Sequence, residues 1–268
     1  GEHNRFTSTV YIDHSFTLLK EKLILSPGFS ISYFSDLSFH SFPGIDFGYS
    51  FNEKTSIYTN FGKTYRVPTY TDLYYSDRTT LGNADLEPES AISSEFGFKY
   101  NSKKIVFKTA VFTRKSKNII DYVKQNEDDL WQATNIGLLK TSGLESDLII
   151  KFKSNINLRL GYSLINDDNY ISDIKFSKYS LNSLKHNFIS KISFNYSKNL
   201  SQNIVFRYAE RNDLTNYTII DSNISFKPFS QDSELFLNLN NILDQYYWET
   251  NLVPMPGKNF IIGYRASL

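Results

Sequence analysis

The sequence predicts an all-β protein, specifically an antiparallel β-barrel that crosses a membrane. The prediction rests on hydrophobic alternation with a period of two, on the length of the alternating segments, and on connections that alternate between short and long. The composition agrees, because 16% of the residues are aromatic, with 22 Phe and 19 Tyr, while the mean hydropathy is only −0.37. Strands of a membrane barrel turn one row of side chains to lipid and the other to water, and aromatic residues gather at the two interfaces.

The same numbers exclude several other classes of protein. The 268 residues have room for one large β domain or two small ones, and the net charge of +1 favours neither nucleic acid nor another charged partner. The chain has no cysteine, so disulfides and thiolate metal sites are excluded. No run approaches the roughly 20 apolar residues of a membrane-spanning helix. The first residues, GEHNR, are not a signal peptide, and we expect one upstream of the given sequence.

The alternation is clearest near the C-terminus. Phe260, Ile262 and Tyr264 share one face with Ala266 and Leu268, and the residues between them fall on the other face. Leucines at 235, 237 and 239 in the same way oppose polar residues at 234, 238 and 240. Strands with the same pattern are predicted around residues 45–51, 96–100, 144–152, 156–164, 188–196, 204–208, 220–226, 235–239 and 260–268. Many of these segments extend to about 10 residues, the length that a tilted strand needs to cross a bilayer.

The connections alternate between two lengths. Short ones are predicted at residues 19–21, 52–55, 101–103, 154–155, 198–200 and 229–232, and long ones at 65–90, 117–134, 167–183, 211–216 and 244–258. Outer-membrane barrels have short periplasmic turns and long extracellular loops, so this rhythm also indicates which end faces outward. Alternation is less clean in the part of the chain before His40, and the strand limits there are left open.

The count comes to about 13 strands, whereas bacterial barrels have an even number. An open edge would leave unpaired backbone groups in lipid. We therefore expect the chain to be part of a larger barrel, completed by sequence not given or by another chain.

Three segments, in this order, resemble the TonB-dependent outer-membrane receptors. The first is FGKTYRVPTYTDLYY at residues 61–75 with LGNADLEPE at 81–89. The second is NIG at 135–137 with GLE at 143–145. The third is NLNNILDQYY at 238–247 with PMPGKNF at 254–260. Gly263 and the residues after it also resemble the C-terminal assembly signal of outer-membrane proteins, although Leu268 stands where Phe is more usual.

The resemblance implies that residues 1–268 form the C-terminal part of a 22-stranded barrel whose lumen holds an N-terminal plug. The plug and the first strands are absent from the given sequence. The partners implied are outer-membrane lipid, the plug and missing barrel strands, the TonB complex acting through the plug, a small-molecule nutrient, and a surface lipoprotein. No nucleic-acid partner and no cofactor are expected, and the location implied is the outer membrane of a Gram-negative bacterium.

Within the family, residues 118–123 and 130–135 look most like the cobalamin (vitamin B12) receptors of Bacteroidetes-type bacteria. The resemblance therefore implies active uptake of cobalamin. Siderophore or haem receptors share much of the same frame and remain an alternative. A passive porin or an adhesin is a second alternative.

The outer loops hold the candidate ligand contacts, because loops on a rigid frame commonly carry function. Flat aromatic rings can stack on a planar ligand, and arginine can pair with phosphate or carboxylate. The competing interpretation is that these rings form the interfacial girdle or pack the loops. The candidates are Tyr65, Arg66, Tyr70, Tyr74, Tyr75, Arg78, Tyr122, Trp131, Gln132, Tyr246, Tyr247 and Trp248.

Other candidate sites are weak. The four histidines, at positions 3, 14, 40 and 186, lack metal-ligand spacing, and no catalytic set is recognisable, so no enzyme is predicted. Acidic residues at 127–129 and 167–168 could bind calcium, but solvated loops of this kind are far commoner. Pro68 is expected to end a strand. Charges on the inward faces, at 95, 99, 145, 147, 151, 159 and 207, are expected to form a lumen network.

Overall fold

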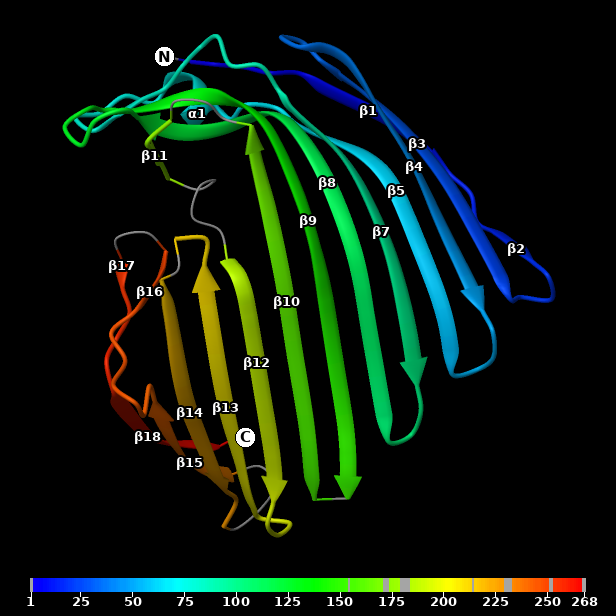
Figure 1. Ribbon diagram of the computed structural model, residues 1–268, viewed down its shortest axis with the longest axis vertical. Helices are drawn as coiled ribbons and strands as arrows, with labels where there is room; N and C mark the ends of the chain where they lie inside the picture. The colour runs from blue at the N-terminus through cyan, green and yellow to red at the C-terminus, as the bar shows by residue number, and fades with distance from the viewer. Residues whose placement is uncertain are drawn as a thin grey trace. The chain divides into compact units, whose positions relative to one another are not determined.

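The computed structural model describes residues 2–153, 155–170, 174–178, 184–213, 215–228, 233–250 and 253–266. Within these ranges the protein is built almost wholly of strands (Figure 1). The structure therefore confirms the predicted all-β fold. No helix in the described part is both long and apolar enough to cross a membrane.

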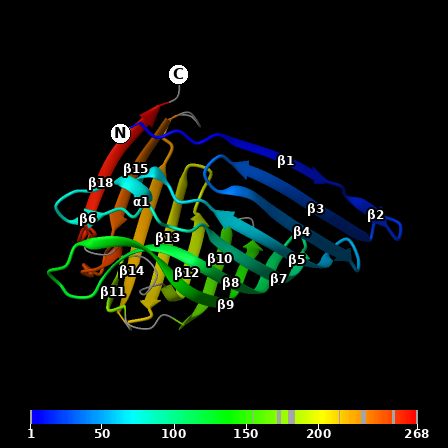
Figure 2. The ribbon, with the colours of Figure 1, turned by 90° about the horizontal axis from the view of Figure 1, so that it is seen from above.

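The chain divides into two compact units. The first comprises residues Gly1–Lys99, Ala110–Leu144 and Ile165–Ser183. Its elements, with β7, β8 and β9 continuing into the second unit, are β1 (Thr7–Asp13), β2 (Phe16–Leu18), β3 (Leu23–Phe34), β4 (Ser38–Ser50), β5 (Thr55–Arg66), α1 (Tyr70–Tyr74), β6 (Thr80–Leu81), β7 (Glu89–Asn101), β8 (Ile105–Lys124), β9 (Trp131–Lys153) and β11 (Phe176–Ser177). Figure 2 shows β3, β4 and β5 side by side.

The second unit comprises residues Tyr100–Thr109, Glu145–Leu164 and Leu184–Leu268. Its own strands, with the end of β10 belonging to the first unit, are β10 (Ile156–Tyr170), β12 (Leu184–Asn195), β13 (Leu200–Arg211), β14 (Asn216–Phe226), β15 (Ser233–Asn240), β16 (Trp248–Thr250), β17 (Val253–Pro254) and β18 (Asn259–Ala266). The small hairpin β16–β17 lies within the connection between β15 and β18.

Hydrogen bonds link the main strands in the order β1-β3-β4-β5-β7-β8-β9-β10-β12-β13-β14-β15-β18, with β2, β6 and β11 paired beside this path. The path has the 13 strands counted from the sequence. The described registers are antiparallel, apart from the two-residue parallel pairing of β6 with β9. Because sequence neighbours pair in this way, each strand needs only a turn or a loop to reach the next.

The two faces of the sheet in the second unit differ as the alternation predicts. On one face Leu237 pairs with Ile262, and Leu239 with Phe260. On the other face Asn223 donates to Asn238 (2.6 Å) within a polar ladder that includes the bonds Ser193–Asn203 (2.7 Å) and Asn203–Asn223 (3.4 Å). Ile262 is 71% exposed. A face of large exposed apolar side chains is suited to lipid.

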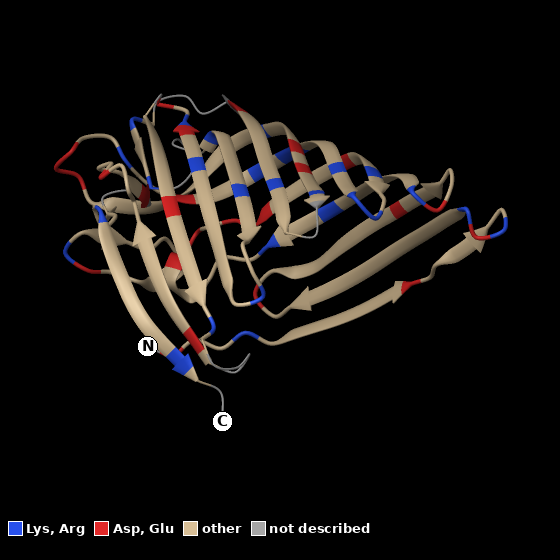
Figure 3. Ribbon diagram, turned by 90° about the horizontal axis from the view of Figure 1, so that it is seen from below, with Lys and Arg blue, Asp and Glu red and all other residues tan. Residues whose placement is uncertain are grey.

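Charged residues lie along the strands as well as at their ends (Figure 3). Arg159 pairs with Asp147 at 2.7 Å, and Arg207 pairs with Asp221 at 3.1 Å, so part of the predicted network of inward charges is present.

The predicted loop rhythm needs three corrections. Strands β8 and β9 extend beyond the expected limits, which reduces the predicted loop 117–134 to residues 125–130. β10 continues to Tyr170, and β11 occupies part of the predicted loop 167–183. β3 and β4 are joined by a tight turn at residues 35–37. This short turn lies at the same end of the first unit as the long loop 67–88, where the rhythm predicts long loops. The predicted turn at 229–232 lies outside the described residues.

Candidate functional site

The loop at residues 67–88 is organised around the short helix α1. Thr69 caps the helix: its hydroxyl accepts the Asp72 backbone N–H at 3.1 Å, and the Asp72 carboxylate accepts the Thr69 N–H at 2.9 Å. This reciprocal capping box satisfies two backbone donors that the helix would otherwise leave unpaired. Pro68 is fully buried just after β5 ends at Arg66, as expected for a residue that ends a strand.

Gly82 lets the loop fold back onto this helix. Its N–H donates to the Tyr75 carbonyl at 2.6 Å, and the Asn83 N–H donates to the Asp72 carbonyl at 2.9 Å. A Cβ at position 82 would lie 2.9 Å from backbone atoms of Leu73 and Tyr74. A side chain therefore does not fit here, and glycine at this position allows the loop to turn back against α1.

A small apolar core holds the loop on β8 and β9. Leu73 and Leu86 from the loop pack with Ile120 and Ala133, and Tyr122 lies against them. Because Ile120 and Tyr122 alternate with the buried Asp121 along β8, they turn to the same face.

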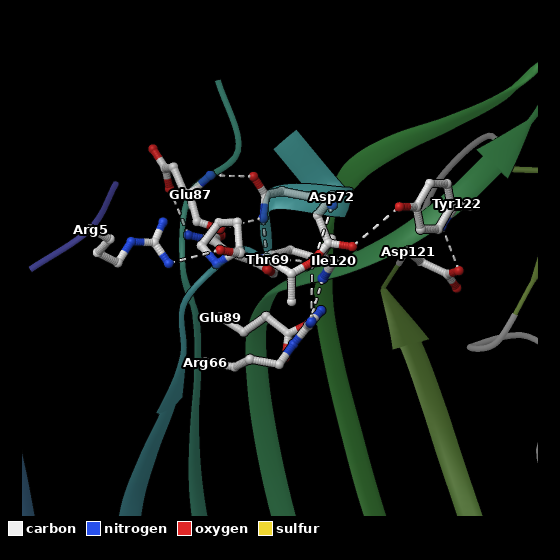
Figure 4. A network of polar contacts seen from close by, with 12 residues as sticks. Arg5, Arg66, Thr69, Asp72, Glu87, Glu89, Ile120, Asp121 and Tyr122 are labelled. Carbon is white, nitrogen blue, oxygen red and sulfur yellow. Dashed lines mark hydrogen bonds and ion pairs between the residues drawn. The ribbon is translucent and has the colours of Figure 1, made fainter. Parts of the chain in front are cut away.

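Polar side chains from the first two motifs brace the same loop. Asn135 accepts the Glu87 backbone N–H (2.7 Å) and donates to the carbonyls of Glu87 and Asn118, each at 2.8 Å. Glu89 accepts from Arg66 at 2.7 Å and from the Ile120 N–H at 2.8 Å. Figure 4 shows part of this set of contacts, which hold the loop in place.

A pocket of about 580 Å³ lies between the loop and the outer end of β8. Its wall is mainly polar, with hydroxyl groups, two cationic and two anionic side chains. Asp72 faces Tyr122, whose hydroxyl donates to the carboxylate at 3.3 Å (Figure 4). The residues that line it are Arg66, Thr69, Thr71, Asp72, Tyr75, Asp77, Thr80, Ile120, Tyr122 and Lys178.

Asp77 organises one rim of this pocket. Its carboxylate accepts the N–H groups of Thr79 and Thr80, both at 2.7 Å, and the Tyr75 hydroxyl at 2.8 Å. These bonds, the backbone bond from Thr79 first, lower the pKa of Asp77 to about 2. The same contact raises the pKa of the Tyr75 hydroxyl.

The structure brings only some of the predicted ligand residues to this pocket. Arg66, Tyr75 and Tyr122 line it. Trp131 lies next to it, because the Lys178 ammonium is 5.1 Å from its ring. Gln132 is exposed on β9 where β6 pairs, and Arg78 is exposed in the loop.

Three predicted rings instead have neighbours in the chain itself. Tyr65 stacks on His40 and its hydroxyl is 2.7 Å from the imidazole. Tyr74 stacks on His3 with ring centres 3.7 Å apart, and Arg5 lies 5.5 Å from the Tyr70 ring. These three rings therefore pack against other residues of the chain, as the competing interpretation expects.

The second unit has a pocket of its own, of about 270 Å³. Tyr247 lines it and is 6% exposed, with its ring 4.7 Å from that of Tyr217. Tyr246 and Trp248 are exposed and contact each other edge to face at 5.1 Å. The rest of the lining is Arg207, Asp221, Asn240, Asn241, Pro256 and Asn259.

Sequence reasoning missed several lining residues. Thr71 belongs to the first motif, and Asp77 and Thr80 lie between its two parts, but residues of these types are common in loops, so nothing distinguished them. Lys178 reaches the pocket because β11 pairs with β8 and the Lys178 N–H donates to the Tyr122 carbonyl at 3.0 Å. No local pattern indicates that pairing, because the whole of β9 and β10 lies between the two segments in the chain.

Long antiparallel strands with one exposed apolar face, and a long loop built into a polar pocket, are typical of barrel proteins of the bacterial outer membrane. Residues 1–242 match the family model described as TonB dependent receptor-like, beta-barrel. The chain therefore belongs to the TonB-dependent receptor family, which places it in the outer membrane of a Gram-negative bacterium.

The chain is similar to known proteins in two ways, in sequence over a short stretch and in fold over nearly its whole length. A 90-residue stretch, 34% of this chain and 14% of the relative, is 26% identical to the vitamin B12 transporter BtuB of Vibrio vulnificus. The siderophore receptor PirA of Pseudomonas aeruginosa has a TM-score of 0.77 and 15% identity, over 98% of this chain and 47% of that one. The copper transporter OprC has a TM-score of 0.79 and 14% identity over the same shares. These structures support the fold alone, and this chain spans less than half of their length.

Proposed function

We propose that the chain is the C-terminal part of the barrel of a receptor for TonB-dependent uptake, and that its ligand is cobalamin. The barrel would be completed by strands and a plug encoded upstream. Two findings support the ligand: the short similarity to a vitamin B12 transporter, and the resemblance of residues 118–123 and 130–135 to that branch.

The observation that carries the choice of ligand is the charge of the pocket wall. Arg66 and Lys178 are balanced by Asp72 and Asp77, and Glu89 adds a further carboxylate 2.7 Å from Arg66. A ligand with several negative charges, such as a ferric catecholate, would face these carboxylates and gain little net attraction. A ligand rich in neutral amides can instead use the hydroxyls of Thr69, Tyr75 and Tyr122 as partners.

Uptake of a siderophore or haem is the second candidate. It is favoured by the fold, which is shared with proteins described as siderophore receptors. A passive porin or an adhesin barrel is a weaker alternative, because neither needs a loop that is braced around a pocket.

The test is ligand binding by the full-length receptor purified in detergent. Calorimetry with cyanocobalamin, haem and a ferric siderophore is expected to give tight binding for cyanocobalamin only. Tight binding of only the siderophore would reject the proposed ligand. The gene is also expected to encode a plug of about 100–150 residues, the size of an ordinary domain, before Gly1. A gene without one would reject energy-coupled uptake.

A further inference from the structure

Three lysines gather on the outer part of β8 and β9. The group, called the outer lysine cluster below, consists of Lys115 and Lys117 of β8 and Lys140 of β9, and all three are exposed. None of the three lines either of the pockets described above. The function proposed for those pockets therefore gives the cluster no role.

The alternation of β8 turns its two lysines to the face assigned to lipid. Arg114 donates to Ser116 at 3.2 Å, and Ser116 is buried, so these two side chains share one face of the strand. Lys115 and Lys117 point to the opposite face. Val111 shares that face, and its apolar side chain is 51% exposed. The face on which both lysines lie is thus the one with exposed apolar residues.

Lys140 has the same orientation on β9. Its neighbour Thr141 donates to Asp167 of β10 at 2.7 Å. Asp167 is on the same face of β10 as Arg159, one of the charges predicted to face the lumen, because an even number of residues separates them. Lys140 therefore points away from the lumen, on the same side as Leu144.

The pairing of β8 with β9 brings two of the lysines opposite each other. The hydroxyls of Thr109 and Ser146 are 2.8 Å apart, and Lys115 and Lys140 come six residues further outward on the two strands. Directly opposed residues of a continuous antiparallel pair have Cβ atoms about 4.5–5.5 Å apart, and like charges there are unfavourable. An anion beside both ammonium groups would offset their repulsion.

No ion pair neutralises the cluster in the part of the chain that the structure describes. None of the three ammonium groups has an ion pair or a side-chain hydrogen bond there. Asp168 of β10 is turned to the same side as Lys140, and its carboxylate accepts from the Asn166 amide at 3.4 Å. One carboxylate beside three ammonium groups leaves a net positive charge.

The height of the cluster matches the outer edge of the lipid. Lys115 is ten residues beyond Ile105, where β8 begins, which is about 33 Å along the strand. A strand tilted by about 45° rises about 23 Å over that length, close to the roughly 25 Å height of the apolar band of an outer-membrane barrel. From this level a lysine can lay its stem along apolar surface and extend its ammonium group to the headgroups.

We propose that the outer lysine cluster binds the phosphate groups of lipid A, the phosphorylated glycolipid of the outer leaflet. The family places the chain in the outer membrane of a Gram-negative bacterium, so this lipid surrounds the barrel at the level of the cluster. Basic clusters at a membrane surface attract anionic headgroups, and lysine binds phosphate as a point charge. The inference goes beyond the proposed function and does not depend on which nutrient is transported.

Native mass spectrometry of the full-length receptor measures lipid binding directly. The receptor is purified in detergent, freed of endogenous lipid, and titrated with diphosphoryl lipid A or with the same lipid after removal of its phosphates. The wild type is expected to bind the diphosphoryl form at least about tenfold more tightly, because each lysine near an anionic headgroup adds to the attraction. Equal affinity for the two forms would overturn the proposal without recourse to any variant.

Substitutions of the opposed pair locate the site. Lys115→Gln/Lys140→Gln is expected to weaken binding of diphosphoryl lipid A at least about tenfold and to leave binding of the dephosphorylated lipid unchanged. Lys115→Arg/Lys140→Arg keeps both charges and is expected to bind like the wild type. Heat-dependent gel mobility confirms that each variant is folded before it is titrated.

The matched control is Lys103→Gln/Lys104→Gln, which removes the same charge from two exposed residues of the turn between β7 and β8, at the other end of β8. This control is expected to leave the titration unchanged. An equal loss in both glutamine variants would reduce the effect to net charge and overturn the site.

Other occupants of the cluster give different results. Phosphatidylglycerol bound as tightly as lipid A, and lost equally in Lys115→Gln/Lys140→Gln, would show a surface for any anionic lipid and overturn the assignment to lipid A. A second copy of the receptor or another membrane protein that co-purifies with the wild type, and is lost in the same variant, would show that protein covers the cluster and would also overturn the proposal.

Discussion

Asn135 shows how one side chain can hold a long loop in place. Its amide accepts one backbone N–H and donates to two carbonyls, so it joins Glu87 at the end of the loop to Asn118 on β8. The motif that contains Asn135 was found in the sequence as part of a family resemblance. The structure gives a physical reason for asparagine at position 135, because only an amide side chain offers both an acceptor and two donors in this geometry.

We expect Asn135→Leu to destabilise the loop by about 1–3 kcal/mol, because the backbone groups of Glu87 lose their partners. Limited proteolysis of the folded receptor measures this as faster cleavage within residues 67–88. Gln132→Ala, at an exposed position of the same strand, is the control and should leave the rate of cleavage unchanged. A loop equally resistant in wild type and in Asn135→Leu would contradict the brace.

Asp77 gives the pocket rim a dependence on pH. The folded-state pKa is about 2, below the ordinary value of 3.8, so the charged carboxylate stabilises the folded turn. A lowered pKa means that this stabilisation is complete above the unfolded-state value and disappears as the pH falls through the folded-state value. We therefore expect the turn to loosen between about pH 5 and pH 2.

Hydrogen-exchange protection of the Thr79 and Thr80 amides measures this loosening directly. In Asp77→Asn the protection of both amides should be lower at neutral pH and should no longer change over this range. Protection in the wild type that is constant down to pH 2 would show that the carboxylate does not hold the turn.

The limits of sequence reasoning are clearest at single residues. Tyr75 and Tyr122 were predicted as ligand contacts and do line the pocket, whereas Tyr74 stacks on His3. Alternation and motifs place all three rings in outer segments equally well. Which ring remains available depends on contacts between segments that are distant in the sequence, and local patterns carry no information about those.

At the scale of elements, the two faces of a strand should respond differently to charge. Leu237 and Ile262 are directly paired across β15 and β18, on the face assigned to lipid, while Asn238 accepts a bond from Asn223 on the other face. Leu237→Arg and Ile262→Arg should each cost about 2–4 kcal/mol near the bilayer midplane, and Asn238→Arg should cost much less.

Urea titration of the receptor folded into lipid vesicles measures these differences in the free energy of unfolding. Equal losses for Leu237→Arg and Asn238→Arg would refute the assignment of the faces. The bonded network around Asn223 makes a small loss expected even on the polar face.

The lengths of β8 and β9 explain why the loop predicted at residues 117–134 is longer than the loop in the structure. Period-two alternation locates the part of a strand with lipid on one side, and there the prediction was accurate. Beyond that part β8 and β9 continue, and the continuation is covered by Leu73 and Leu86 of the neighbouring loop. In these continuations of β8 and β9, residues on the face that holds the core are buried. The alternation typical of a membrane strand is therefore lost, and the sequence resembles that of a loop.

At the scale of the whole molecule, the fold was the most predictable property. Antiparallel pairing of sequence neighbours makes each strand a local unit, so alternation and turn positions suffice to number the strands and order them. The pockets were less predictable, because each requires side chains from several connections. Lys178 reaches its pocket only because β11 pairs with β8, which is not its neighbour in the sequence.

The ends of the strand order lead to the last prediction. Among the described residues, β1 pairs only with β3, and β18 only with β15. Each of these strands therefore has one row of backbone donors and acceptors without a described strand partner, which lipid does not tolerate. In the proposed receptor these rows pair with strands encoded upstream.

We therefore expect residues 1–268, expressed alone with a signal peptide, to fail to form a heat-modifiable, protease-resistant barrel in the outer membrane, while the full-length gene product forms one. Gel mobility with and without heating distinguishes the two. Supplying the upstream part as a separate chain should restore the folded band, because strand pairing needs adjacent backbones and not a continuous chain. A folded band from residues 1–268 alone would show that these strands close on themselves or on a second copy, and would overturn the proposal that this chain is one part of a larger barrel.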